Sequence, residues 1–218
     1  TFTTSNWNTA QTITVTGVDD SLDDGDITTT LTATASNSGG YAGTETATTT
    51  LKTSDNDSSG ITIAKTGTTD GSGNLLTTEA GSTSTFTVVL DAKPTADVTV
   101  SITGTDSTEH SLSSSSLTFT TSNWNTAQTI TVTGVDDSLD DGDITTTLTA
   151  TASNSGGYAG SETATTTLKT SDNDTAGITI AQTGSTDGSG NLLTTEAGST
   201  STFTVVLDAK PTANVPLS

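Results

Sequence analysis

A near-perfect internal repeat constrains the fold of this chain more than any other feature. Residues 1–101 match residues 118–218 at an offset of 117, and only eight of the 101 aligned pairs differ. The differences fall at positions 44, 58, 59, 65, 68, 97, 99 and 100. Near-identity at this level indicates recent duplication within a tandem array, not a pair of domains with separate roles.

The best boundary between repeats follows each Asp-Asn-Asp segment, where Ser58-Ser59-Gly60 precedes an apolar strand. We therefore expect residues 1–57 to be the C-terminal part of one repeat, residues 58–174 a complete repeat, and residues 175–218 the N-terminal part of the next. Two whole periods would also need a second copy of residues 102–117. The preferred interpretation is a section of a longer fibre-like chain or filament. A domain-swapped filament, in which partial repeats of neighbouring copies complement each other, is the less favoured alternative.

Apolar and hydroxyl residues alternate along the chain with a period of two, which predicts strands and not helices. The clearest strands are 61–63, 84–88, 97–102, 116–120, 129–133, 144–152 and 162–170. Clusters of Gly, Asn, Asp and Pro, such as Asp70-Gly71-Ser72-Gly73-Asn74, separate these strands as turns. The chain is therefore predicted to be all-β, built from tandem seven-stranded antiparallel β-sandwich repeats of 117 residues.

Without this alternation, the high content of Thr and Ser would suggest a disordered chain. Thr and Ser number 59 and 28, about 40% of the 218 residues, while hydrophobic residues make up only 28%. Threonine, however, is a strong strand former that tolerates water on the outer face of a sheet. The apolar positions of the alternation form a small predicted core: Ile61, Ile63, Phe86, Val88, Leu90, Val98, Val100, Ile102, Leu117, Phe119, Ile130, Val132, Ile144, Leu148 and Leu168.

The charge of the chain excludes several classes of function. A net charge of −20 excludes an unaided binder of nucleic acid or of anionic membranes. No run of 18 apolar residues is present, so direct insertion into a bilayer is not expected. The absence of Cys excludes disulfides, thiolate zinc sites and cysteine nucleophiles.

Acidic residues concentrate at the predicted ends of strands. Five aspartates occupy the 136–143 loop, and two more occupy 172–174 at the end of the repeat. If both segments follow strands that run in the same direction, they meet at one end of the sandwich and repel strongly without a cation. Oxygen-only ligands without His or Cys favour calcium over zinc or copper, and Mg²⁺ rarely uses all-protein cages. The sequence therefore predicts Ca²⁺ at the seams between repeats.

The complete repeat resembles a Calx-β domain, the sandwich found in sodium–calcium exchangers, integrin β4 and many large bacterial surface proteins. The resemblance covers the whole repeat. It starts with Glu79, which precedes a strand, and with Asp106 and Glu109, which follow the third strand. It continues with an Asp-Asp loop that has acidic residues four and seven positions further on (136–143), and ends with the acidic segment 172–174. It implies calcium ligation by Glu79, Asp106, Glu109, Asp136, Asp137, Asp140, Asp143, Asp172 and Asp174. The offset of 117 extends the prediction to Asp19, Asp20, Asp23, Asp26, Asp55, Asp57 and Glu196.

These features together predict a structural protein and not an enzyme. The repeats are expected to act as rigid spacers in an extracellular fibre or giant bacterial adhesin, with Ca²⁺ at each seam. The expected location is the bacterial cell surface, in cell adhesion or a biofilm. The expected partners are neighbouring repeats of the same chain or filament, with surface glycans contacted through other parts of the protein.

Two other classes of function remain open. Rows of exposed threonines, such as Thr129, Thr131 and Thr133, could bind glycans or ice, although exposed threonine more often serves only to solvate a sheet. Trp7 and Trp124 could be sugar platforms, but their position at a turn favours packing. An enzyme is disfavoured, because consecutive Glu, His and Ser residues around His110 do not make a catalytic triad in space.

Overall fold

The computed structural model describes all residues, 1–218, as an all-β chain of two compact units, Thr1–Ser58 and Ser59–Ser218. It contains no helix, and so no helical segment long and apolar enough to cross a bilayer. An all-β fold agrees with the period-two alternation of the sequence. The unit boundary after Ser58 does not test the predicted repeat bounds, which stay predictions.

The first unit is built on one hairpin. Strands β1 (Ile27–Thr34) and β2 (Thr46–Thr53) pair antiparallel, with Ile27 opposite Thr53 and Thr34 opposite Thr46. Residues 1–26 form no strand, and nearly all side chains of the unit are exposed. A two-stranded hairpin alone cannot bury both faces of its strands.

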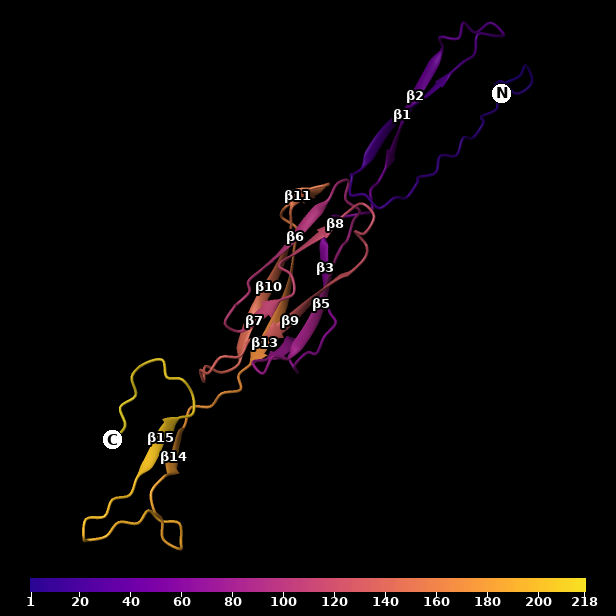
Figure 1. Ribbon diagram of the computed structural model, residues 1–218. Coiled ribbons are helices and arrows are strands. Elements are labelled where there is room, and N and C mark those ends of the chain that lie inside the picture. Colours follow the sequence, from indigo (N-terminus) through magenta and orange to yellow (C-terminus); the bar gives the residue numbers. More distant parts are fainter. The chain divides into compact units, whose positions relative to one another are not determined.

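The second unit contains a sandwich of two sheets between residues 61 and 171 (Figure 1). One sheet has five strands in the order β4-β13-β10-β6-β8: Leu75–Thr78, Thr163–Ser171, Ile144–Ala152, Val98–Thr103 and Ser116–Phe119. The other has four strands in the order β3-β5-β9-β7: Ile61–Lys65, Thr83–Leu90, Gln128–Gly134 and His110–Leu112.

The predicted count of seven strands is not confirmed, because these sheets contain five and four strands. The sequence analysis did not identify β4 and β7, which are short and whose sequences, LLTT and HSL, do not alternate apolar and hydroxyl residues. The sandwich is also not purely antiparallel, because β4 runs parallel to β13, with Leu75 beside Leu168. All other strand pairs of the two sheets are antiparallel.

The core lies between the two sheets and follows the predicted alternation. Phe86, Phe119, Ile130, Leu148 and Leu168 are all at most 1% exposed. Ile63, Leu117 and Ile144, also predicted to face inward, are only half-buried. The core includes apolar residues that the sequence analysis did not select: Leu75, Ala92, Ala150, Ala152 and Tyr158. Each large buried side chain contributes about 1.5–3 kcal/mol of hydrophobic stabilisation.

Two small hairpins complete the second unit. Strands β11 (Asn154–Ser155) and β12 (Tyr158–Ala159) form a short turn. Strands β14 (Ile178–Gln182) and β15 (Phe203–Leu207) repeat the pairing of β3 with β5. The apolar side chains of β14 and β15 remain largely exposed, unlike those of β3 and β5.

Candidate metal centre

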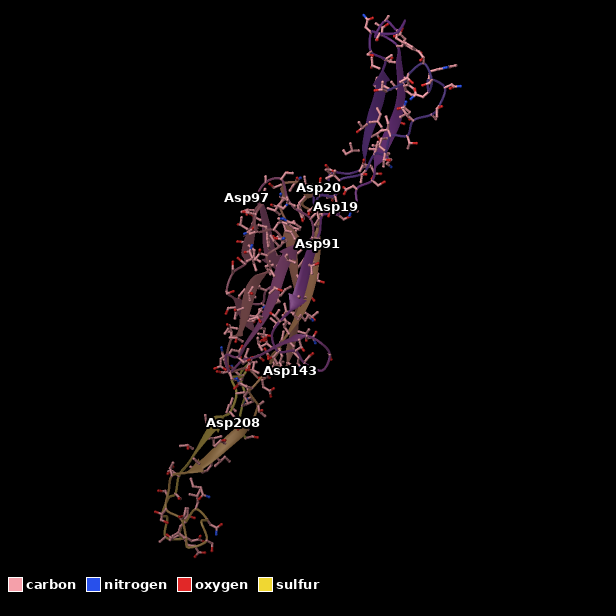
Figure 2. The ribbon with its side chains drawn as sticks, turned by 90° about the vertical axis from the view of Figure 1, so that its right-hand side faces the viewer. Asp19, Asp20, Asp91, Asp97, Asp143 and Asp208 are labelled. Atoms are coloured by element: carbon pink, nitrogen blue, oxygen red, sulfur yellow. The ribbon has the colours of Figure 1, made fainter.

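Four acidic segments meet at one end of the sandwich formed by residues 61–171. Glu79 follows β4, Glu109 precedes β7, the 135–143 loop connects β9 to β10, and residues 172–174 follow β13. Figure 2 shows Asp143 at this end and Asp97 at the opposite end. We call the end marked by Asp143 the acidic pole.

Backbone contacts hold these segments together. The Glu79 N–H donates to Ser171 O (3.1 Å), and the Val135 N–H donates to Glu109 O (2.8 Å). Gly134 allows the end of β9 to approach β4, because a Cβ atom there would lie 2.0 Å from Thr78 O. The acidic pole is therefore positioned by the main chain of both sheets.

The carboxylates of the acidic pole form two groups that share Glu79. The ligand oxygens of Glu79, Asp136 and Asp174 lie within 4.8 Å of one another, as do those of Glu79, Glu109 and Asp141. Glu79 and Glu109 are only 1% and 4% exposed. Burying a carboxylate costs free energy unless it is paired, so this arrangement favours a bound cation or protonation.

The pKa values reflect this burial. Burial raises the pKa of the Glu79 carboxyl, and although a hydrogen bond from the Asn173 N–H opposes this, the negative charges of Asp172 and Asp137 add to it. Burial also raises the pKa of Glu109, and the negative charges of Asp141 and Glu79 raise it further. Both groups therefore hold protons more strongly than free glutamate when no cation is bound.

One carboxylate oxygen at the acidic pole lacks any donor. Asp174 Oδ2 is buried without a hydrogen-bond partner, and burial, followed by the charge of Asp172, raises the pKa of Asp174. Lys169, in β13, is already paired with Asp143 Oδ2 at 2.6 Å. The donor set is entirely oxygen, so these residues fit a hard cation, and Ca²⁺ better than Mg²⁺ because Ca²⁺ accepts several carboxylates in a flexible geometry.

Several predicted ligands bind backbone N–H groups and lie outside the two carboxylate groups. The pairs are Asp137 Oδ1 with Leu139 N, Asp140 Oδ2 with Ala176 N, and Asp172 Oδ2 with Gly142 N, each at 2.7 Å. Asp106 accepts hydrogen bonds from the N–H and hydroxyl of Thr108, and the hydroxyl bond is the main cause of its lowered pKa. Their role as metal ligands stays a prediction.

Asp141 is the one member of the two groups that the sequence-based ligand set left out. It belongs to the same acidic loop as the predicted Asp140, so the local signal was present. The choice between neighbouring aspartates depends on the direction in which the loop turns, and Gly142, with a φ of 78°, controls that turn.

In the first unit, the predicted ligands gather around Asp57. Burial raises the pKa of Asp57, and the charges of Asp55, Asp19, Asp20 and Asp23 raise it further. Asp26 pairs with Lys52 at 2.5 Å, just as its repeat counterpart Asp143 pairs with Lys169. Glu196, in the second unit, is exposed and belongs to neither group of the acidic pole.

Apart from Glu109, the residues that suggested glycan binding, ice binding or an enzyme are not part of the two carboxylate groups. Cross-strand threonine pairs such as Thr147 with Thr167 line the outer side of β10 and β13. Lys65 Nζ donates to Thr167 Oγ1 at 3.2 Å and so interrupts this row. His110 is buried whereas the adjacent Ser111 is exposed, as expected for neighbours on a strand. Trp124 packs against the core, whereas Trp7 is exposed.

Comparison with known proteins gives no family assignment. No family model and no curated protein matches this chain. Many solved structures, 32 chains in all, are similar to this chain, and three of them illustrate the similarity. SSP-19 of Caenorhabditis elegans, titled an MSP-domain protein like family member, is 12% identical with a TM-score of 0.31, covering 45% of this chain and 92% of its own.

The other two are a Porphyromonas gingivalis W83 protein of unknown function and the E. coli chaperone DraB. The first is 10% identical with a TM-score of 0.35, and the match covers 56% of this chain and 55% of that one. DraB is 8% identical with a TM-score of 0.35, and the match covers 71% of this chain and 86% of that one. At these values the similarities carry no argument about family or activity.

Proposed function

We propose that this chain is a structural calcium-binding array, a section of an extracellular fibre or giant bacterial cell-surface adhesin. Each repeat is a Calx-β-like or immunoglobulin-like sandwich that serves as a rigid spacer and not as an enzyme. Ca²⁺ at each acidic pole neutralises the carboxylates and stiffens the connection to the next repeat. Neighbouring repeats are the main partners.

The observation that carries this proposal is the position of Glu79. Its buried carboxylate is shared by two groups of acidic oxygens, and one oxygen of the neighbouring Asp174 is buried without a donor. A carboxylate cluster of this kind, with Lys169 already paired to Asp143, is stable at neutral pH only if a cation is bound or protons are retained.

We propose an extracellular location because the calcium concentration there matches the affinity of weak calcium-binding modules. Extracellular modules commonly bind Ca²⁺ with dissociation constants of about 10⁻⁴–10⁻³ M, which suits surroundings of similar calcium concentration. At a concentration about 100 times the dissociation constant, one site stabilises the folded state by roughly 2.7 kcal/mol. The calcium dependence of folding is therefore large enough to measure.

The test is thermal melting of the chain in Ca²⁺, in Mg²⁺ and in chelator. We expect Ca²⁺ to raise the melting temperature, Mg²⁺ to raise it less, and a Glu79→Gln, Glu109→Gln double variant to lose most of the calcium response. The matched control is Asp97→Asn, at the opposite end of the sandwich, which introduces the residue that the next repeat carries naturally at position 214. Equal melting in calcium and chelator contradicts the proposal.

A glycan- or ice-binding module is the alternative function, and the outward threonine pairs of β10 and β13 are the observation in its favour. Flat, regular hydroxyl rows could match an ice or sugar surface. The contact of Lys65 with Thr167 breaks this regularity, which is why we prefer the calcium-dependent spacer. A thermal hysteresis or glycan-array signal in chelator would favour the alternative.

A further inference from the structure

The 135–143 loop of the complete repeat contacts the repeat that follows it. Asp140 Oδ2 accepts a hydrogen bond from the Ala176 N–H, and Ser138 O accepts one from the Lys210 N–H, both at 2.7 Å. Ala176 lies just before β14 and Lys210 lies just after β15. Because the first residue of β14 pairs with the last residue of β15, both contacts hold the same end of this hairpin.

The residues of this loop are divided between two partners. Asp136 and Asp141 belong to the two carboxylate groups that share Glu79. Ser138 and Asp140 supply the oxygens that bind the following repeat. Asp140 and Asp141 are adjacent, so a displacement of one also moves the other. The loop therefore connects the candidate metal centre to the following repeat.

The end of the hairpin that receives these contacts has the same local structure in the complete repeat. The Asp208 N–H donates to Gly177 O at 3.0 Å, and its counterpart, the Asp91 N–H, donates to Gly60 O at 3.0 Å. A Cβ atom on either glycine would collide with the carboxylate of the aspartate opposite. The receiving surface is therefore a property of the repeat itself.

The following repeat contributes main-chain donors to both contacts. Ala176 aligns with Ser59, and Lys210 aligns with Lys93, so the side chain at one of the two donor positions differs between repeats. Every residue other than proline carries a backbone N–H, and both contacts are therefore independent of this difference. Successive repeats of an array can dock in the same way.

We propose that the outer side of the 135–143 loop is the docking surface that fixes the orientation of the following repeat, with Asp140 as a positioning residue. This inference rests on the proposed function, because the partner is the next repeat of the same array. Relative motion is the default for linked domains. Here the following repeat is held by two hydrogen bonds besides the covalent link, and the one to the ionised Asp140 is of the stronger kind.

The segment that joins the two repeats is restrained by the same acidic pole. The Asn173 N–H donates to Glu79 Oε2 and the Asp172 N–H donates to Asp143 Oδ1, both at 3.1 Å. The Asp174 N–H donates to Asp172 Oδ1 at 2.7 Å. Without a cation, repulsion among the carboxylates acts on the loop and on this segment together. The docking should therefore be tighter when the carboxylate groups hold a cation.

The test measures the orientation of one repeat relative to the next. The chain is extended after Ser218 by a second copy of residues 102–174, which completes the following repeat. Because the chain has no Cys, Thr165→Cys in β13 and Ala181→Cys in β14, both at exposed positions, provide two sites for spin labels. Double electron–electron resonance gives the distribution of distances between the labels. We expect a single narrow distribution in calcium and a broader one in chelator.

Two pairs of variants isolate the docking contacts. Lys210→Pro removes the N–H donor, so the narrow distribution in calcium should be lost, whereas Lys210→Ala keeps the donor and should leave it narrow. Asp140→Ala removes the charged acceptor and should also broaden the distribution. Asp140→Asn keeps an acceptor oxygen and should retain most of the narrow component. Thermal melting of each variant checks that the sandwiches remain folded.

Calorimetric titration of the same samples with calcium separates this inference from the proposed function. A failure to bind calcium would contradict the proposed function alone, because the comparison of Lys210→Pro with Lys210→Ala tests the docking whether or not a cation binds. Equal widths for Lys210→Pro, Asp140→Ala and the unmodified chain would overturn the docking. An unmodified chain that binds calcium but is equally narrow in chelator would overturn the link between the cation and the docking.

Discussion

Glu79 and Glu109 belong to different sheets, yet their carboxylate oxygens lie within 4.8 Å of each other and of Asp141. Glu79 follows the edge strand β4 of the five-stranded sheet, and Glu109 precedes the edge strand β7 of the four-stranded sheet. Two buried like charges destabilise a fold unless a cation or a proton is present. This pair therefore links the stability of the sandwich to calcium and to pH.

Removing one of these charges should have opposite effects with and without calcium. In chelator, Glu109→Gln removes a buried, repelled charge while keeping the shape of the side chain, so the free energy of unfolding should rise by about 1 kcal/mol. In saturating Ca²⁺ the same variant loses a ligand, and up to roughly 2.7 kcal/mol of calcium-dependent stabilisation should disappear.

Urea unfolding followed by Trp124 fluorescence measures both effects. A Trp7→Phe background leaves Trp124 as the only tryptophan and so reports on the sandwich alone. The control is Asp97→Asn, which should change stability equally in chelator and calcium. A Glu109→Gln variant that is destabilised by the same amount in both conditions would indicate a purely structural role for Glu109.

In the calcium-free sandwich, the two buried glutamates should contribute less stability as pH rises above the ordinary glutamate range. The pKa values of Glu79 and Glu109 are raised above 4.5, so the folded state keeps protons that the unfolded chain has already released. Stability is then greatest below 4.5 for these groups and falls as pH rises through their folded pKa values. The lowered pKa values of Asp143 and Asp172 act in the opposite sense only below 3.8, and burial lowers the pKa of His110, which acts in the opposite sense below 6.5.

Calcium should reverse this dependence on pH. Ca²⁺ binds the deprotonated carboxylates, so its contribution to stability increases as pH rises. Urea unfolding at about pH 5 and about pH 8 should show a growing difference in stability between calcium and chelator. A difference that stays constant or shrinks as pH rises over this range would contradict the prediction.

The close approach of β9 to β4 gives a prediction about Gly134. An alanine Cβ at this position would lie 2.0 Å from Thr78 O, so Gly134→Ala must displace the end of β9 and the acidic loop that follows. We expect a loss of about 2–3 kcal/mol in unfolding free energy and weaker calcium binding. Gly71→Ala is the matched control, because nothing lies within 4 Å of its Cβ position. Equal melting temperatures for the two variants would show that the main chain accommodates the change.

The period-two pattern predicted the long strands well, because the face of the sheet to which each side chain points follows from its position along the strand. Ile130 and Val132 alternate with threonines, and both are fully buried in β9. The pattern missed β4 and β7, which are short edge strands whose pairing depends on residues distant in the chain. Leu75 enters the core beside Leu168 through a parallel contact that no local spacing indicates.

The sequence by itself determined the repeat, the inward and outward residues of most strands, and the placement of aspartates after strand ends. These properties follow from the alternation of side chains along an extended backbone. Only the tertiary structure decided that Glu79 and Glu109 are buried together and that Asp141, and not Asp140, faces them. The reason is that pairing between distant strands and the turn at Gly142 set these distances, and both depend on how the two sheets pack.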